Sequence, residues 1–138
     1  MAILKSINSN SILLRPIRYE NPKESWLIAE VVLKSNEVNT KSIGSYINKY
    51  ELLDLIKAID LVIKNRASYT SNFIEPNLEI KINYIEDNIL VLIKFSPMLE
   101  YDESTGKIIG ETYFEMNTSK DELEKFKLSL ENDFGKLE

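Results

Sequence analysis

The sequence contains no cysteine and no histidine among its 138 residues. Without cysteine the chain can form no disulfide, no thiolate nucleophile and no cysteine metal site. Without histidine it lacks the commonest general base, the Ser-His-Asp and Cys-His catalytic arrangements and the usual zinc ligand. Its four glycines show no spacing typical of a nucleotide-phosphate loop. We therefore expect a protein that is not an enzyme, with no cofactor and no metal site.

Long apolar runs are missing as well, since the longest covers only Ile89–Ile93. A helix that spans a bilayer needs about 18 consecutive apolar residues. The first residues also lack the apolar stretch and the small-residue cleavage site of a signal peptide. Together with the missing cysteines, these features predict a cytoplasmic protein that does not associate with membranes.

Basic residues are outnumbered, with 17 Lys and Arg against 22 Asp and Glu, for a net charge of −5. Binding to duplex nucleic acid depends largely on Lys and Arg that neutralise phosphates, so we expect no nucleic-acid partner. The negative charge fits either simple solubility or a basic protein partner. The length is close to the commonest domain size and 43% of residues are apolar, which predicts one domain over residues 1–138.

The first 47 residues have the composition of strands. Ile12–Tyr19 is rich in β-formers, but its Pro16 cannot donate to a ladder and predicts a sheet edge or a bulge. Trp26–Leu33 is apolar on both faces and predicts a central strand, and a weaker strand follows at Thr40–Ile47. Turn residues separate these segments, which favours antiparallel pairing.

Two segments have helical periodicity. Asn48 and Glu51 have the spacing of a capping box and begin a predicted helix over Lys49–Arg66. Ser119 and Glu122 have the same spacing at the start of a second helix. The apolar stripes of the two helices are Leu52, Leu55, Ile56, Ile59 and Ile63, and Leu123, Phe126, Leu130 and Phe134.

Between the helices the apolar residues alternate again. This pattern predicts antiparallel strands at Leu78–Tyr84 and Ile89–Phe95, a polar loop at Glu100–Lys107 and a further strand at Ile108–Met116. Strands followed by a helix, twice over, predict an α+β fold. We expect a mostly antiparallel sheet of about six to eight strands with two amphipathic helices packed on one face.

Five acidic residues follow one another with few intervening positive charges. Glu100, Asp102 and Glu103 lie in the predicted loop, and Glu111 and Glu115 lie in the next strand. If the loop folds over its strand, the five carboxylates form a negative patch that attracts a basic partner. The alternative is a solvated loop whose charges only maintain solubility.

Paired carboxylates are the one arrangement left for acid–base catalysis. The candidates are Glu75 and Glu79, and Glu111 and Glu115, because residues two or four apart on a strand share a face. A pair in a concave pocket would indicate a carboxylate-dependent hydrolase. A solvated sheet face accounts for the same pattern without catalysis.

The order of several short motifs resembles that of the bacterial WapI-type immunity proteins. Trp26-Leu27 opens a strand and Glu51-Leu52 begins the first helix. An aromatic residue, Glu-Pro and an alternating strand then follow over Phe73–Ile82. An aromatic strand at Tyr113–Met116 and a helix with Leu123-x-x-Phe126 complete the resemblance, which covers about residues 26 to 134.

This resemblance implies a cytoplasmic antitoxin that binds and blocks the toxin domain of a polymorphic or contact-dependent toxin. It implies no catalytic residue, and because toxin-binding residues vary with the toxin, it assigns none here. The leading hypothesis is therefore a non-catalytic immunity protein whose partner is a basic toxin domain. A small binding or adaptor module with another partner is the alternative, followed by the hydrolase.

Overall fold

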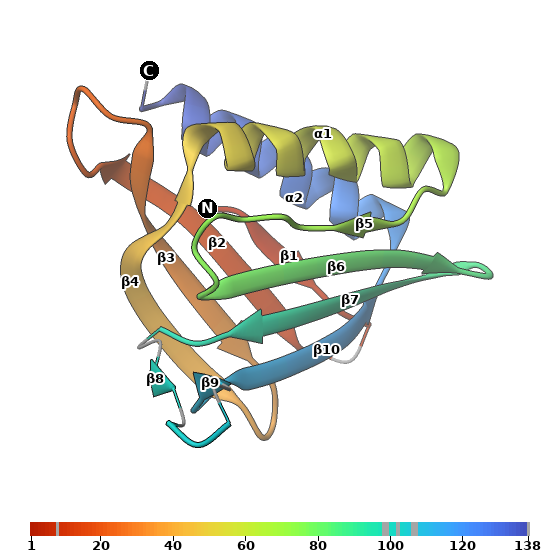
Figure 1. Ribbon diagram of the computed structural model, residues 1–138. Helices are drawn as coiled ribbons and strands as arrows, with labels where there is room; N and C mark the ends of the chain where they lie inside the picture. Colours follow the sequence, from red (N-terminus) through yellow and green to blue (C-terminus); the bar gives the residue numbers. More distant parts are fainter. Residues whose placement is uncertain (8, 98–99, 102, 106–107, 138) are drawn as a thin grey trace.

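The computed structural model describes residues 1–7, 9–97, 100–101, 103–105 and 108–137 (Figure 1). Its elements, in chain order, are β1 (Ile3–Lys5), β2 (Ser11–Tyr19), β3 (Trp26–Lys34), β4 (Asn39–Asn48), α1 (Lys49–Asn65), β5 (Tyr69–Thr70), β6 (Leu78–Ile85), β7 (Asn88–Phe95), β8 (Glu100–Tyr101), β9 (Ile108–Ile109), β10 (Thr112–Thr118) and α2 (Lys120–Gly135).

Eight of the strands form two antiparallel sheets of four. The first sheet has the order β1-β2-β3-β4, and the second has the order β10-β7-β6-β5. The two helices run together along one side of the molecule, where α2 contacts β1 and β2 and α1 contacts β4, β5 and β6 (Figure 1). The predicted α+β class, the antiparallel pairing and the two helices on one side are confirmed. The division of the strands between two sheets is new.

The first sheet is irregular at Pro16. The pairing of β2 with β3 shifts register between Pro16 and Arg18, so the predicted bulge is present. The pairing of β1 with β2 covers only Ser11–Leu13, which leaves the edge at Pro16 without a strand partner in the described chain. A proline is tolerated there because its missing N–H breaks no ladder hydrogen bond. Strand β3 lies between β2 and β4, in the predicted central position.

A second register shift lies between Leu27 and Ala29 on β3, and beyond it the last three residues of β4, Tyr46, Ile47 and Asn48, are all buried. One of them, Tyr46, folds back along its own strand so that its hydroxyl lies 2.6 Å from the Ser42 hydroxyl. Its ring meets the Phe95 ring of the second sheet edge-on, with centroids 5.1 Å apart. The two sheets are therefore joined through an aromatic contact as well as through aliphatic packing.

The predicted capping box of α1 is present. Asn48 accepts a hydrogen bond from the Glu51 N–H at 2.9 Å, and the Glu51 carboxylate accepts one from the Asn48 N–H at 3.0 Å. The helix ends at Asn65, and Arg66 follows in the left-handed conformation with φ 52°. At α2, Ser119 accepts from the Glu122 N–H at 3.2 Å. Both helices thus begin where local sequence chemistry predicts.

The boundaries predicted between β7 and β10 are wrong in two respects. The segment Ile108–Met116 is not one strand, because Gly110 takes φ +70° and separates β9 from β10. The polar loop also contains strand β8, which pairs antiparallel with β9. A left-handed glycine is inexpensive, and it redirects the chain where a continuous strand would have carried it straight on.

The core fills the space between the sheets and under the helices. The predicted stripe residues Leu52, Leu55 and Ile59 of α1 are buried, as are Leu123 and Leu130 of α2. A cavity of about 20 Å³ lies among the apolar side chains of the two sheets and α2, and a volume of this size holds about one water molecule. No helix of the described chain is long and apolar enough to cross a bilayer.

Candidate partner-binding surface

Of the five predicted acidic residues, the structure describes the side chains of Glu103, Glu111 and Glu115. Glu103 is exposed in the turn between β8 and β9, and Glu115 is exposed on β10. Glu111, the residue immediately before β10, is half-buried. The backbone of Glu100 belongs to β8, but its side chain lies outside the described residues, as does all of Asp102.

Strand β10 forms one edge of the second sheet. It pairs with β7 along its whole length, from Thr112 opposite Phe95 to Thr118 opposite Ile89. On its other side, the Asn117 C=O accepts a hydrogen bond from the Ile7 N–H at 3.3 Å. No strand of the described chain lies along the rest of this side.

A groove of about 410 Å³ follows this open edge. We call it the edge groove, and its lining residues are Asn10, Ser35, Asn36, Glu37, Val38, Tyr113, Phe114 and Glu115. One wall is β10 and the other is the turn between β3 and β4. Two of these described lining residues are glutamates and none is Lys or Arg, so the groove favours positive charge.

The turn that forms the second wall is held by one serine. The Ser35 hydroxyl accepts hydrogen bonds from the Val38 N–H at 2.9 Å and the Glu37 N–H at 3.2 Å. The Ser35 N–H donates to the Val38 C=O at 2.7 Å. These bonds fix the backbone that carries the exposed Glu37, so the acidic wall is preorganised.

The outer face of the second sheet carries charges of both signs. Its register places Tyr113, Lys94 and Glu79 in one row across β10, β7 and β6, and a parallel row runs from Glu115 to Lys81. These residues line a second, smaller groove of about 250 Å³. On the sheet face, Lys81 and Lys94 therefore balance the negative charge around β10. The described lining of the edge groove contains no such positive charge.

Tyr113 lies where the two grooves meet. A hydrogen bond to the Glu111 carboxylate raises the pKa of Tyr113, and the charge of the same carboxylate adds to the effect. The Lys94 Nζ lies 5.7 Å from the centre of the Tyr113 ring, within cation–π range. The tyrosine is 67% exposed, so it presents a ring held in place and open to a partner.

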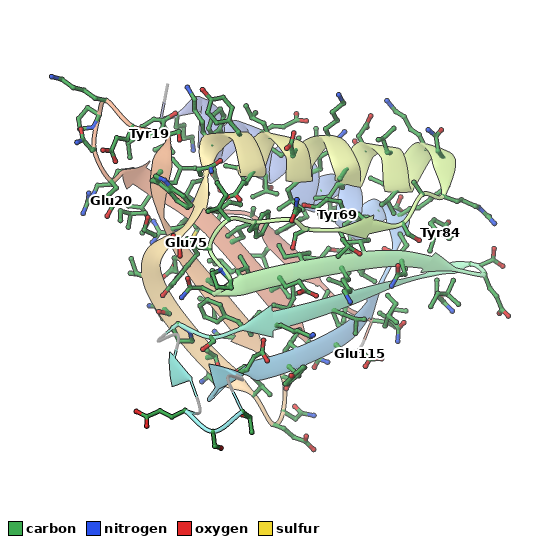
Figure 2. The ribbon with its side chains drawn as sticks, in the orientation of Figure 1. Tyr19, Glu20, Tyr69, Glu75, Tyr84 and Glu115 are labelled. Atoms are coloured by element: carbon green, nitrogen blue, oxygen red, sulfur yellow. The ribbon has the colours of Figure 1, made fainter. Side chains whose placement is uncertain are left out.

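The carboxylates considered for a hydrolase do not all lie together. Figure 2 places Glu75 near the start of β6 and Glu115 on β10, in different parts of the view. Glu79 and Glu115 do line the same groove, but β7 lies between their strands and Glu79 pairs with Lys81 at 3.5 Å. The Glu79 side chain is 37% exposed and paired with lysine, so it is solvated and not buried as a general acid would need. No group of three or more potential metal ligands occurs in the part of the chain that the structure describes.

Two features of this surface were not predicted from the sequence, namely Glu37 as a wall residue and the open side of β10. The alternation of Thr112–Thr118 identifies a strand, but it does not identify an edge strand. The turn around Glu37 lies about 75 positions before β10 in the sequence, and only the packing of the two sheets brings them together.

The fold and the site define a small α+β protein with an acidic groove at an open sheet edge. The chain belongs to the Immunity protein WapI-like family, whose sequence profile matches residues 3–138. The resemblance predicted for residues 26 to 134 is thus confirmed and extends to the N-terminal strands. No curated protein and no solved structure matches the chain.

Proposed function

We propose that this protein is a cytoplasmic immunity protein that binds a cognate bacterial toxin domain and blocks it without catalysing a reaction. The observation that carries the proposal is the family match over nearly the whole chain. Members of such a family need a partner-binding surface and no chemical step, which agrees with a sequence that lacks histidine and cysteine.

The charge around β10 supports a basic partner. We propose that Glu100, Asp102, Glu103, Glu111 and Glu115 belong to the toxin-binding surface, together with Glu37 of the edge groove. A toxin that cleaves nucleic acid has a basic cleft for the phosphates. An acidic inhibitor complements such a cleft, speeds the encounter and excludes the substrate by occupying its site.

Co-expression tests the function directly. The candidate toxin for this test is the C-terminal domain encoded by an adjacent toxin gene, and it is expressed in a sensitive host with and without this protein. We expect this protein to restore growth and to co-purify with the domain. Growth arrest in its presence, together with no co-purification, would contradict the proposal.

Substitution of the described acidic residues tests the surface. In the triple variant Glu103→Ser, Glu111→Ser and Glu115→Ser, we expect affinity for the toxin domain to fall by about tenfold or more at low salt. The difference should shrink as salt screens the charges. The matched control carries Glu24→Ser, Asp54→Ser and Glu131→Ser, which remove three exposed charges elsewhere. Equal affinities for the two triple variants would exclude the β10 surface.

A further inference from the structure

The free side of β10 presents backbone groups to the edge groove. In an antiparallel strand the N–H and C=O of one residue point to the same side, and successive residues alternate. Because the Asn117 C=O binds the Ile7 N–H outside the β7–β10 ladder, the backbone groups of Tyr113 and Glu115 point to that same free side. Both residues line the edge groove.

The hairpin of β6 and β7 supports this assignment independently. Ile85 and Asn88 flank its two-residue turn as partners, and such flanking residues exchange hydrogen bonds with each other. Asn88 and every second residue after it on β7 therefore bond to β6, and the residues between them bond to β10. Two of these, Ile93 and Val91, lie opposite Phe114 and Met116 of β10. Tyr113 and Glu115 lie between these bonded positions.

We propose that the partner inserts an extended, basic segment into the edge groove and pairs it with the free side of β10. The added strand exchanges backbone hydrogen bonds with Tyr113 and Glu115, which is recognition by strand addition. The inference rests on the proposed function, since it specifies how the toxin domain is held.

The ends of the groove limit the length of the added strand. At one end the Ile7 N–H already occupies the Asn117 C=O. At the other end Gly110 turns the chain out of the strand with φ +70°. The partner segment therefore pairs beside Thr112–Met116, a length typical of short natural strands.

The walls of the groove select a positive segment. Side chains of a strand added beside β10 alternate between the two sheet faces, and those on the outer face come next to Glu115. Glu37 faces the segment from the opposite wall of the groove. Lys or Arg at alternate positions would pair with these two carboxylates.

The same charges argue against a second copy of this chain as the occupant. A copy that pairs through β10 would bring its own Glu115 next to the first, and like charges across a strand pair are destabilising. Charged residues on an edge strand commonly protect it from self-association. Here they leave the edge open to a strand of opposite charge.

Strand β4 provides an internal comparison because it is the long edge of the first sheet. The Ser35–Val38 hydrogen bond and the register of β3 with β4 place the backbone groups of Lys41 and Ile43 on its free side. Lys41 is positive and Ile43 is exposed and apolar. This edge therefore lacks the charge that would select a basic strand.

Matched proline substitutions on the two edges test the inference. Glu115→Pro and Ile43→Pro each remove an N–H that points away from the sheet, so neither breaks an internal ladder hydrogen bond. Binding of the purified, catalytically inactivated toxin domain is measured with the full chain, and thermal unfolding checks that each variant is folded. We expect Glu115→Pro to weaken binding by about tenfold or more and Ile43→Pro to change it by less than about twofold. Glu115→Gln, which keeps the N–H, should weaken binding less than the proline does.

Hydrogen exchange gives a second readout that needs no variant. In the free protein we expect the Tyr113 and Glu115 amides to exchange rapidly, because both donors are solvated. In the saturated complex both should become protected, whereas the Lys41 and Ile43 amides should remain fast. Fast exchange of Tyr113 and Glu115 in the complex would overturn strand addition.

The outcomes distinguish the inference from the function on which it rests. If the wild-type protein does not bind the toxin domain, the proposed function fails and the inference fails with it. If the wild-type protein binds and folded Glu115→Pro binds equally well, strand addition fails and the immunity role stands. Loss of binding only in Ile43→Pro, or protection of the β10 amides by self-association without toxin, also overturns the inference.

Discussion

The Lys127 Nζ lies 3.1 Å from the Asp60 Oδ1 and joins the middle of α2 to α1. Lys127 is 9% exposed and also reaches Glu124, while Asp60 binds Lys64 at 2.9 Å through its other oxygen. The two helices are thus joined by a four-residue charge network as well as by apolar packing. Hydrogen bonds from Lys64 and Lys127 lower the pKa of Asp60, and the bond to Asp60 raises the pKa of Lys127.

The network predicts acid sensitivity. A carboxylate whose pKa is lower in the folded protein stabilises it above the unfolded-state pKa of 3.8, and this contribution is lost as the pH falls below that value. We expect Asp60→Asn to lower the free energy of unfolding at pH 7 and to flatten its decline below pH 3.8. Denaturant unfolding of both proteins across this range measures the effect. Parallel pH profiles would contradict it.

Removing the Glu51 side chain should strongly reduce the stability of the fold. One oxygen of its carboxylate binds the Asn48 N–H and the other accepts from the Ile74 N–H at 2.7 Å. Glu51→Ala leaves both donors without this partner, so we expect a loss of about 2 kcal/mol or more in the free energy of unfolding. Glu122→Ala, at the equivalent position of α2, removes a Lys125 ion pair at 3.7 Å and should cost less than about 1 kcal/mol. Similar losses in the two variants would rule out the double role of Glu51.

A side chain at position 44 should clash with one neighbour, Tyr46. A Cβ at this position would lie 2.6 Å from the Tyr46 ring. Gly44→Ala should therefore destabilise the protein by about 1–3 kcal/mol. In a Tyr46→Leu background the same substitution should cost much less, because the ring is absent. A double-mutant cycle measures the coupling, and additive effects would contradict the steric explanation.

The raised pKa of Tyr69 predicts that the protein loses stability at high pH. Burial, aided by the charges of Asp54 and Glu51, raises the pKa of Tyr69 to about 12 from 10.0. Because the unfolded chain ionises first, the contribution of the neutral phenol is present below pH 10 and is lost as the pH rises towards 12. Spectroscopic titration should show one tyrosine ionising near pH 12, absent from Tyr69→Phe. The variant should also lose less stability between pH 10 and pH 12.

Local chemistry made much of the fold predictable. The capping pair of Asn48 and Glu51 and the following apolar stripe lie within one segment, so they identify α1 without knowledge of the rest of the chain. The conformation of Pro16 is equally local, and both a bulge and an unpaired edge occur there. The alternation of apolar residues predicted the strands because it records which side chains face a core.

Alternation does not record which sheet a strand joins. Leu78–Ile85 would show the same pattern in one large sheet or in two, so the division into two sheets was not predictable from it. Among the candidate site residues, Glu111 and Glu115 could be grouped from the sequence because they are close in it. The contribution of Glu37 depends on the approach of two distant segments. The left-handed conformation of Gly110, which separates β9 from β10, depends on its surroundings, since glycine permits that conformation without requiring it.

The bond from Glu51 to residue 74 has a consequence for sequence change. The carboxylate contacts the main chain of Ile74, while the Ile74 side chain projects into solvent with 71% of its surface exposed. Any residue except proline at position 74 offers the same amide hydrogen, so this hydrogen bond is compatible with nineteen of the twenty amino acids there. The segment between β5 and β6 can therefore present new side chains to solvent while its backbone remains hydrogen-bonded to the first turn of α1.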